Sequence, residues 1–100
     1  MSKIYEYFGL IFLFYANDHK PIHVHARFGE FESKLELVYK DGKVVDVIIK
    51  RVVGKKHLPN NKLDDAIRLV KSKGDDIGVK WGQFFGTDKN PKCEKITKKI

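Results

Sequence analysis

The chain has 100 residues, of which 42% are hydrophobic and 33% charged, and its formal net charge is +7. This length allows one domain with a modest core and excludes two, while the composition excludes wholesale disorder. A single cysteine excludes an internal disulfide, and the apolar run at residues 8–15 is too short for a membrane helix. We therefore expect a soluble cytoplasmic domain, for which the positive charge favours anionic partners.

Four β-prone segments follow one another in the first half of the chain. Residues 10–15 are apolar on both faces, as in a central strand, and residues 23–28 form the second segment. Residues 32–39 alternate between apolar and polar side chains, and residues 44–52 are rich in β-branched side chains. The Asp-Gly pair at positions 41–42 predicts a hairpin between the last two segments. The four segments are therefore expected to form an antiparallel meander.

Helical spacing replaces the β pattern in the second half of the chain. One apolar stripe at this spacing consists of Leu63, Ala66, Ile67 and Val70. Asn61 is the expected N-cap of this helix, and Asp64 and Asp65 in its first turn suit the helix dipole. A second helix is expected to begin near Asp75 and to end at Gly86. Its apolar face would consist of Ile77, Trp81, Phe84 and Phe85.

These elements predict a single α+β domain over residues 1–86. We expect an antiparallel sheet of about four strands, followed by two C-terminal helices packed on one face. Residues 87–100 carry five lysines and only two acidic residues. This segment is expected to be a basic, flexible tail.

A histidine-rich segment lies between the first two predicted strands. Three of the four histidines, His19, His23 and His25, fall within seven positions. Alternation along a strand places His23, His25 and Arg27 on one face. The residues at 17–19 have the composition of a turn, which would bring His19 back towards the other two imidazoles.

One interpretation of this segment is a metal site. Two imidazoles on the same face of a strand can close on one divalent ion, and the expected ligands are His19, His23 and His25. Asp18 and His57 are alternative further ligands. An open coordination position would allow such a site to activate water, so this interpretation predicts a metal-dependent hydrolase.

A second interpretation needs no cofactor. A histidine can transfer protons at neutral pH, and an arginine can hold a phosphate oxygen, which together suit acid–base cleavage of RNA. The residues assigned to catalysis are His19, His23, His25 and Arg27, and those assigned to substrate contact are Asn17, Lys20 and Arg27. A third interpretation is structural: the histidines bond turn carbonyls, and the chain is a non-enzymatic interaction module. The sequence leaves open whether the protein is an enzyme.

Two motifs resemble those of a bacterial protein family that is classed as a domain of unknown function. They are Phe14–His25, FYANDHKPIHVH, and Trp81–Gly86, WGQFFG. Some members of this family are described as the toxin of a toxin–antitoxin pair, the DhiT type, encoded beside a small partner protein. The resemblance implies a toxin-like protein that acts on RNA or translation, with a small co-encoded antitoxin-like partner. It implies no catalytic residues.

Overall fold

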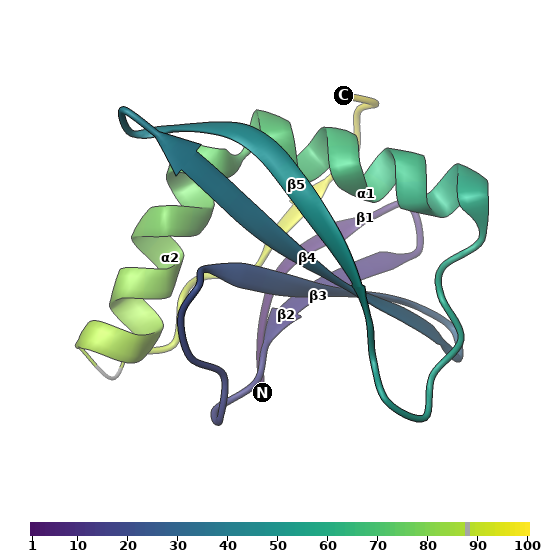
Figure 1. The fold of residues 1–100 in the computed structure, drawn as a ribbon, viewed down its shortest axis with the longest axis horizontal. Coiled ribbons are helices and arrows are strands. Elements are labelled where there is room, and N and C mark those ends of the chain that lie inside the picture. Colours follow the sequence, from purple (N-terminus) through teal and green to yellow (C-terminus); the bar gives the residue numbers. More distant parts are fainter. Residues whose placement is uncertain (88) are drawn as a thin grey trace.

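A computed structural model of the chain describes residues 1–87 and 89–100. The described residues form one sheet and two helices (Figure 1). The strands are β1 (Ser2–Tyr7), β2 (Leu10–Phe14), β3 (His23–Phe28), β4 (Phe31–Lys40), β5 (Lys43–Arg51) and β6 (Glu94–Ile96), and the helices are α1 (Asn60–Ser72) and α2 (Gly74–Gly86). The α+β class is confirmed. The expected number of about four strands is wrong, because the sheet has six.

The sheet has the strand order β5-β4-β3-β2-β1-β6. Strands β1 to β5 are antiparallel neighbours, whereas β6 pairs with β1 in parallel. Two-residue turns join β1 to β2, β3 to β4 and β4 to β5, whereas the longer histidine-rich turn joins β2 to β3. At the turn between β4 and β5, Asp41 and Gly42 both have positive φ, at 54° and 80°, which is the backbone of a type I′ hairpin. The hairpin predicted from the Asp-Gly pair is therefore confirmed.

The two additional strands flank the expected meander. In β1, Tyr5 and Tyr7 are buried and Glu6 between them is half-buried, but a bulge between Lys3 and Tyr5 interrupts the alternation, so the sequence did not reveal this strand. The short strand β6 lies in the segment predicted as a tail. The buried ammonium group of Lys80 holds this segment, because it donates to the carbonyl of Lys92 at 2.9 Å and lies 3.3 Å from the Glu94 carboxylate.

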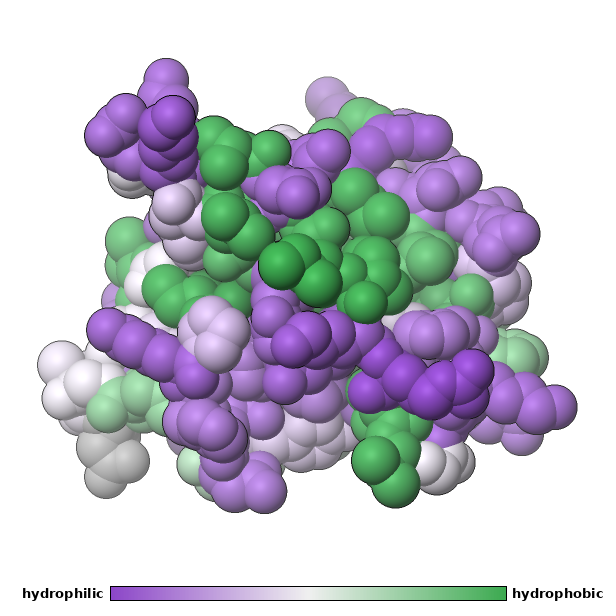
Figure 2. Space-filling model, viewed as in Figure 1, coloured by the Kyte–Doolittle hydropathy of each residue, from purple (hydrophilic) through white to green (hydrophobic). Residues whose placement is uncertain are grey.

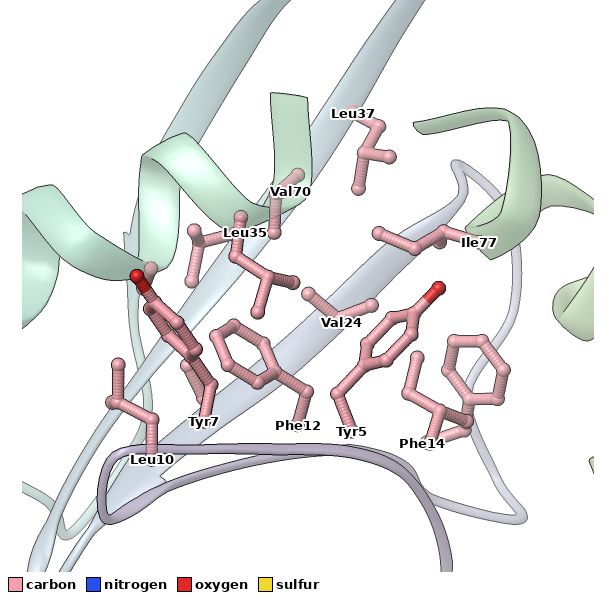
Figure 3. Packing of buried hydrophobic residues seen from close by; sticks show 14 of the residues in the cluster. Tyr5, Tyr7, Leu10, Phe12, Phe14, Val24, Leu35, Leu37, Val70 and Ile77 are labelled. Carbon is pink, nitrogen blue, oxygen red and sulfur yellow. The ribbon is translucent and has the colours of Figure 1, made fainter. Parts of the chain in front are cut away.

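The core lies between the sheet and the helices (Figure 3). Strand side chains in it include Tyr5, Tyr7, Leu10, Phe12, Phe14, Val24, Leu35 and Leu37. The helices add Val70 and Ile77 to the same cluster. Of the two predicted apolar faces, Ala66, Val70, Ile77 and Trp81 are buried and the other members are partly buried, whereas Leu69, which the predicted stripe did not include, is fully buried. Helix α1 contacts β4 and β5. No helix of the described residues is long and apolar enough to cross a membrane.

The start of α1 differs from the expectation. The helix begins at Asn60 with Pro59 as its N-cap, and no side chain caps it. The fixed φ of proline suits a helix start, and the carbonyl of Pro59 accepts the first helical hydrogen bond, from Leu63 N–H at 2.8 Å. The assignment of Asn61 as N-cap is therefore wrong. Because α1 begins at Asn60, its first turn holds no acidic residue, and the placement of Asp64 and Asp65 there is also wrong. Helix α2 begins at Gly74, one residue before the expected start.

An aromatic cluster attaches α2 to the end of β2. The ring of Phe14 lies 5.4 Å from that of Trp81, 5.8 Å from that of Phe84 and 5.9 Å from that of Phe85, measured between centroids. Phe14 is fully buried. Because Phe14 is the last residue of β2, these contacts fix the point at which the histidine-rich turn begins.

Candidate functional site: a two-histidine, one-carboxylate cluster

The turn after β2 is closed by Asp18. The Asp18 N–H donates to the carbonyl of Tyr15 at 3.0 Å, and the Asp18 carboxylate accepts the N–H of Tyr15 through Oδ2 at 2.8 Å. Such reciprocal bonds are typical of aspartate in turns. They fix one carboxylate oxygen and leave the other, Oδ1, directed at β3.

Three potential ligand atoms meet at this point. Asp18 Oδ1 lies 3.2 Å from Nε2 of His23 and 3.5 Å from Nε2 of His25, and all three atoms lie within 4.8 Å of one another. Metal–ligand bonds of about 2.1 Å place neighbouring ligand atoms about 3.0 to 3.4 Å apart in octahedral or tetrahedral geometry. The two measured distances are close to this range.

The hydrogen bonding of His23 leaves Nε2 free. Its Nδ1 lies 2.8 Å from the carbonyl of Pro21, an acceptor, so Nδ1 carries the proton and donates. In the neutral ring Nε2 then presents a lone pair. Nε2 is buried and has no hydrogen-bond partner among the described residues, although the Asp18 oxygen lies near it. Two acceptors that face each other in a buried site are unfavourable unless a proton or a cation lies between them.

His25 has the same arrangement. Its Nδ1 donates to Oε2 of Glu32 at 3.1 Å, so that Nε2 also presents a lone pair to Asp18. Burial lowers the pKa of His25, which favours the neutral ring. A histidine that ligates a metal usually donates its other ring nitrogen to a carbonyl or a carboxylate. Here His23 donates Nδ1–H to the carbonyl of Pro21, and His25 donates Nδ1–H to the carboxylate of Glu32.

Glu32 is the centre of a second set of contacts. The Glu32 side chain is only 2% exposed, and the residue lies opposite Arg27 in the β3–β4 pair. Arg27 Nε donates to Oε1 at 3.3 Å, and Tyr15 Oη donates to Oε2 at 3.1 Å. Arg27 Nη2 in turn donates to Tyr15 Oη at 2.9 Å, and this bond raises the pKa of the guanidinium. The positive charge of Arg27 therefore balances the buried carboxylate.

Aromatic rings cover the two histidines. The Trp81 ring lies 5.3 Å from that of His23, and the Tyr15 ring lies edge-on at 4.5 Å from that of His25. The His23 side chain is 3% exposed and that of His25 10%, whereas the Asp18 side chain is 11% exposed. The cluster is thus largely shielded from water, and the remaining exposure is shared between the carboxylate and His25.

The structure brings together only some of the predicted site residues. His23, His25 and Arg27 share one face of β3, as alternation predicted, and Asp18 joins the two histidines. Asn17, His19 and Lys20 are exposed on the turn, and no hydrogen bond or ion pair links them to the cluster within residues 1–87 and 89–100. His57 instead bonds the hydroxyl of Ser33 at 3.0 Å.

Sequence reasoning missed Glu32, although a signal was present. The turn around Gly29 pairs β3 with β4, and this register places Glu32 directly opposite Arg27. Residues opposite each other in an antiparallel pair project from the same face. A hairpin turn at Gly29, combined with the strand alternation, places this carboxylate on the face of β3 that carries His25 and Arg27.

A two-histidine, one-carboxylate set can bind a divalent transition metal and leave coordination positions for water or substrate. The cluster consists of one oxygen and two imidazole nitrogens, each held by a bond from its other side. The structural alternative, in which the histidines only bond their neighbours, accounts for both Nδ1 atoms and, with a proton between one Nε2 and Asp18, for one of the two Nε2 contacts, but it leaves the second Nε2 facing the same oxygen.

The chain matches the model of a protein family. No curated protein and no solved structure matches the chain. A family model described as a domain of unknown function, DUF4160, matches residues 9–82, which include the turn, the cluster and Trp81. This match confirms the resemblance to an uncharacterised family, and the toxin role stays a prediction. Because the matched segment covers most of the chain, the protein belongs to the DUF4160 family.

Proposed function

We propose that the protein binds one divalent transition-metal ion, of the zinc class, through Asp18 Oδ1, His23 Nε2 and His25 Nε2. The observation that supports this most directly is the buried Nε2 atom of His23, which has no hydrogen-bond partner among the described residues. A cation at this position would satisfy that lone pair, the lone pair of His25 and the carboxylate together. Imidazole and carboxylate ligands suit zinc and its neighbours in the first transition row.

The shape of the site favours a hydrolytic role over a closed structural one. Structural zinc sites in proteins use four protein ligands, whereas this cluster supplies three. A zinc ion with three protein ligands lowers the pKa of a bound water to about 7, which makes hydrolysis feasible at neutral pH. Trp81 and Tyr15 would limit the access of other water molecules.

We propose a phosphate-bearing substrate of the RNA class for this centre. The formal charge of +7 supports an anionic substrate, and Lys20 and His19 are exposed on the turn that carries Asp18. Arg27 contributes differently from the sequence prediction, because its guanidinium is bonded to Glu32 and Tyr15. Its role in this proposal is to hold Glu32, and through it His25. A toxin-like activity, controlled by a small co-encoded partner, is the biological role that this chemistry would serve.

Metal analysis tests the first proposal. The purified chain is stripped with a chelator and titrated with Zn²⁺, and separately with Co²⁺, whose visible spectrum reports nitrogen and oxygen ligation. We expect one ion per chain. Binding should be lost in His23→Ala, His25→Ala and Asp18→Asn, and retained in His19→Ala, which removes an exposed histidine from the same turn. Absence of stoichiometric binding by the wild-type chain would refute the metal site and leave a protonated His23–Asp18 pair.

Growth and cleavage assays test the second proposal. Expression is induced in a bacterial host, and the zinc-loaded protein is incubated with RNA in vitro. We expect growth arrest and RNA cleavage with the wild-type chain and His19→Ala, and neither with the His23→Ala, His25→Ala double variant. Arrest that persists in the double variant would exclude a catalytic role for the cluster. Metal binding without cleavage would retain the site and reject the substrate.

A further inference from the structure

Strand β5 is a free edge of the sheet. It pairs with β4 on one side, and no described strand pairs with its other side (Figure 1). Val45 is 55% exposed and Ile48 43%, and in Figure 2 hydrophobic side chains gather along this strand. A long edge strand with exposed apolar side chains readily pairs with another strand. The β5 edge is therefore a candidate surface for pairing with a strand of another chain.

The hydrogen bonds around β5 show which backbone groups face outward. Leu37 of β4 lies opposite Val47, but the Leu37 N–H donates to the carbonyl of Ile22, on the side away from β5. The Leu37–Val47 pair is thus not hydrogen-bonded, and the backbone groups of Val47 point away from β4. In agreement, the Val47 N–H is bonded at 2.9 Å by Oδ1 of the preceding Asp46. By alternation Ile49 and Arg51 also face outward.

We propose that this edge pairs with β5 of a second copy of the chain, antiparallel, about a two-fold axis at Ile48. The segment Asp46–Lys50, DVIIK, is complementary to itself in this register. Asp46 then faces Lys50 of the other copy, and the reverse pair is formed by symmetry. Val47 faces Ile49, and the two Ile48 side chains meet at the axis. The two sheets become one continuous sheet.

The backbone directions fit this register. Outward-facing residues of one antiparallel strand must pair with outward-facing residues of the other, and Val47 with Ile49 meets this condition. Each such pair exchanges two hydrogen bonds, and the bond from Val47 N–H replaces its local bond to Asp46. A two-fold axis at Val47 or Ile49 would satisfy the same condition, but neither places Asp46 opposite Lys50.

The charges decide between a second copy and other occupants. Cross-strand pairs of opposite charge stabilise a sheet, and like charges directly opposite destabilise it. Centring on Ile48 gives two opposite-charge pairs and places no like charges opposite each other within Asp46–Lys50. Lys50 is 53% exposed, and its ion pair with Glu36 of its own chain, at 3.3 Å, is open to solvent, so its ammonium group is accessible to Asp46 of a second copy. The chain's own β5 sequence therefore supplies a complementary strand, so a second copy covers the edge without a different protein as partner.

Sedimentation equilibrium of the full chain, with variants at the axis, tests this proposal. We expect a wild-type dimer whose dissociation constant rises about tenfold or more in Asp46→Lys, Lys50→Asp and Ile48→Lys. The Asp46→Lys, Lys50→Asp double variant restores the charge pairing and should recover most of the affinity. Asp64→Lys, which makes the same charge change at an exposed position of α1, is the control. Thermal unfolding of each variant verifies that it is folded.

Two results would overturn this proposal. One is a wild-type chain that stays monomeric up to about 1 mM. The other is a dimer that Asp46→Lys and Ile48→Lys leave unchanged although both variants are folded. Neither result depends on metal binding, so this test is independent of the proposed function.

Discussion

Substitution of Glu32 by alanine should strongly destabilise the fold even without a metal. The Glu32 carboxylate is 2% exposed and accepts hydrogen bonds from His25, Arg27 and Tyr15. The alanine variant leaves these three donors without their acceptor and leaves the charge of Arg27 without a partner. A buried carboxylate with this many partners is among the most sensitive positions of a small domain.

The magnitude follows from the burial of the partners. Loss of one member of a buried ion pair costs about 3 to 5 kcal/mol. The Arg27 side chain is 32% exposed and regains some hydration, so the lower end of that range, about 3 kcal/mol, is expected. For a domain of this size this corresponds to a decrease in Tm of about 12 to 24 °C. The variant should still fold, because small domains have total stabilities of about 5 to 15 kcal/mol.

Urea unfolding of the chelator-treated protein measures this cost. Glu30→Ala is the matched control, because Glu30 is the same residue type, is exposed and lies two positions away. Its expected effect is within about 0.5 kcal/mol. Arg27→Ala combined with Glu32→Ala should cost less than the sum of the two single changes, since the two residues share one contact. If Glu32→Ala costs no more than Glu30→Ala, Glu32 does not hold the cluster together.

Three further measurements address other features of the structure. Tyr15→Phe removes the hydroxyl shared by Glu32 and Arg27 and should lower the free energy of unfolding by about 1 kcal/mol, measured in urea. Gly74→Ala should destabilise by about 1 to 3 kcal/mol because its Cβ would lie 2.3 Å from Val44 Cγ2, whereas Gly82→Ala, with no atom within 4 Å, should stabilise α2 by up to about 1 kcal/mol. Zn²⁺ at 100 times its Kd should add about 2.7 kcal/mol to the stability of the wild-type chain, and a Tm unchanged by zinc would contradict the metal site.

Much of the fold was readable because its signals are local. Strand β3 has the predicted bounds, and the Asp-Gly turn forms where expected. Strand β6 has only three residues, and its position depends on the contact of Lys80 with a segment twelve residues further along the chain. No pattern within such a short segment indicates a strand, because the pairing is decided by the tertiary structure.

The candidate site was partly predictable for the same reason. Strand alternation placed His23, His25 and Arg27 on one face. It did not indicate which turn residue would reach them: the Asp18 carboxylate is fixed by its bonds to Tyr15, whereas His19 is exposed. The covering ring of Trp81 comes from α2, and its contact with His23 follows from the packing of the helix on Phe14.

All but one of the side chains that form or cover the candidate site lie within a single stretch, Tyr15–Glu32. That stretch is one turn and one hairpin of the sheet. Such a compact unit could be transplanted onto the hairpin of an unrelated protein, with an aromatic residue built above it to replace Trp81. A transplant that acquires the metal affinity proposed for the parent would show that the rest of the chain serves mainly to support this unit.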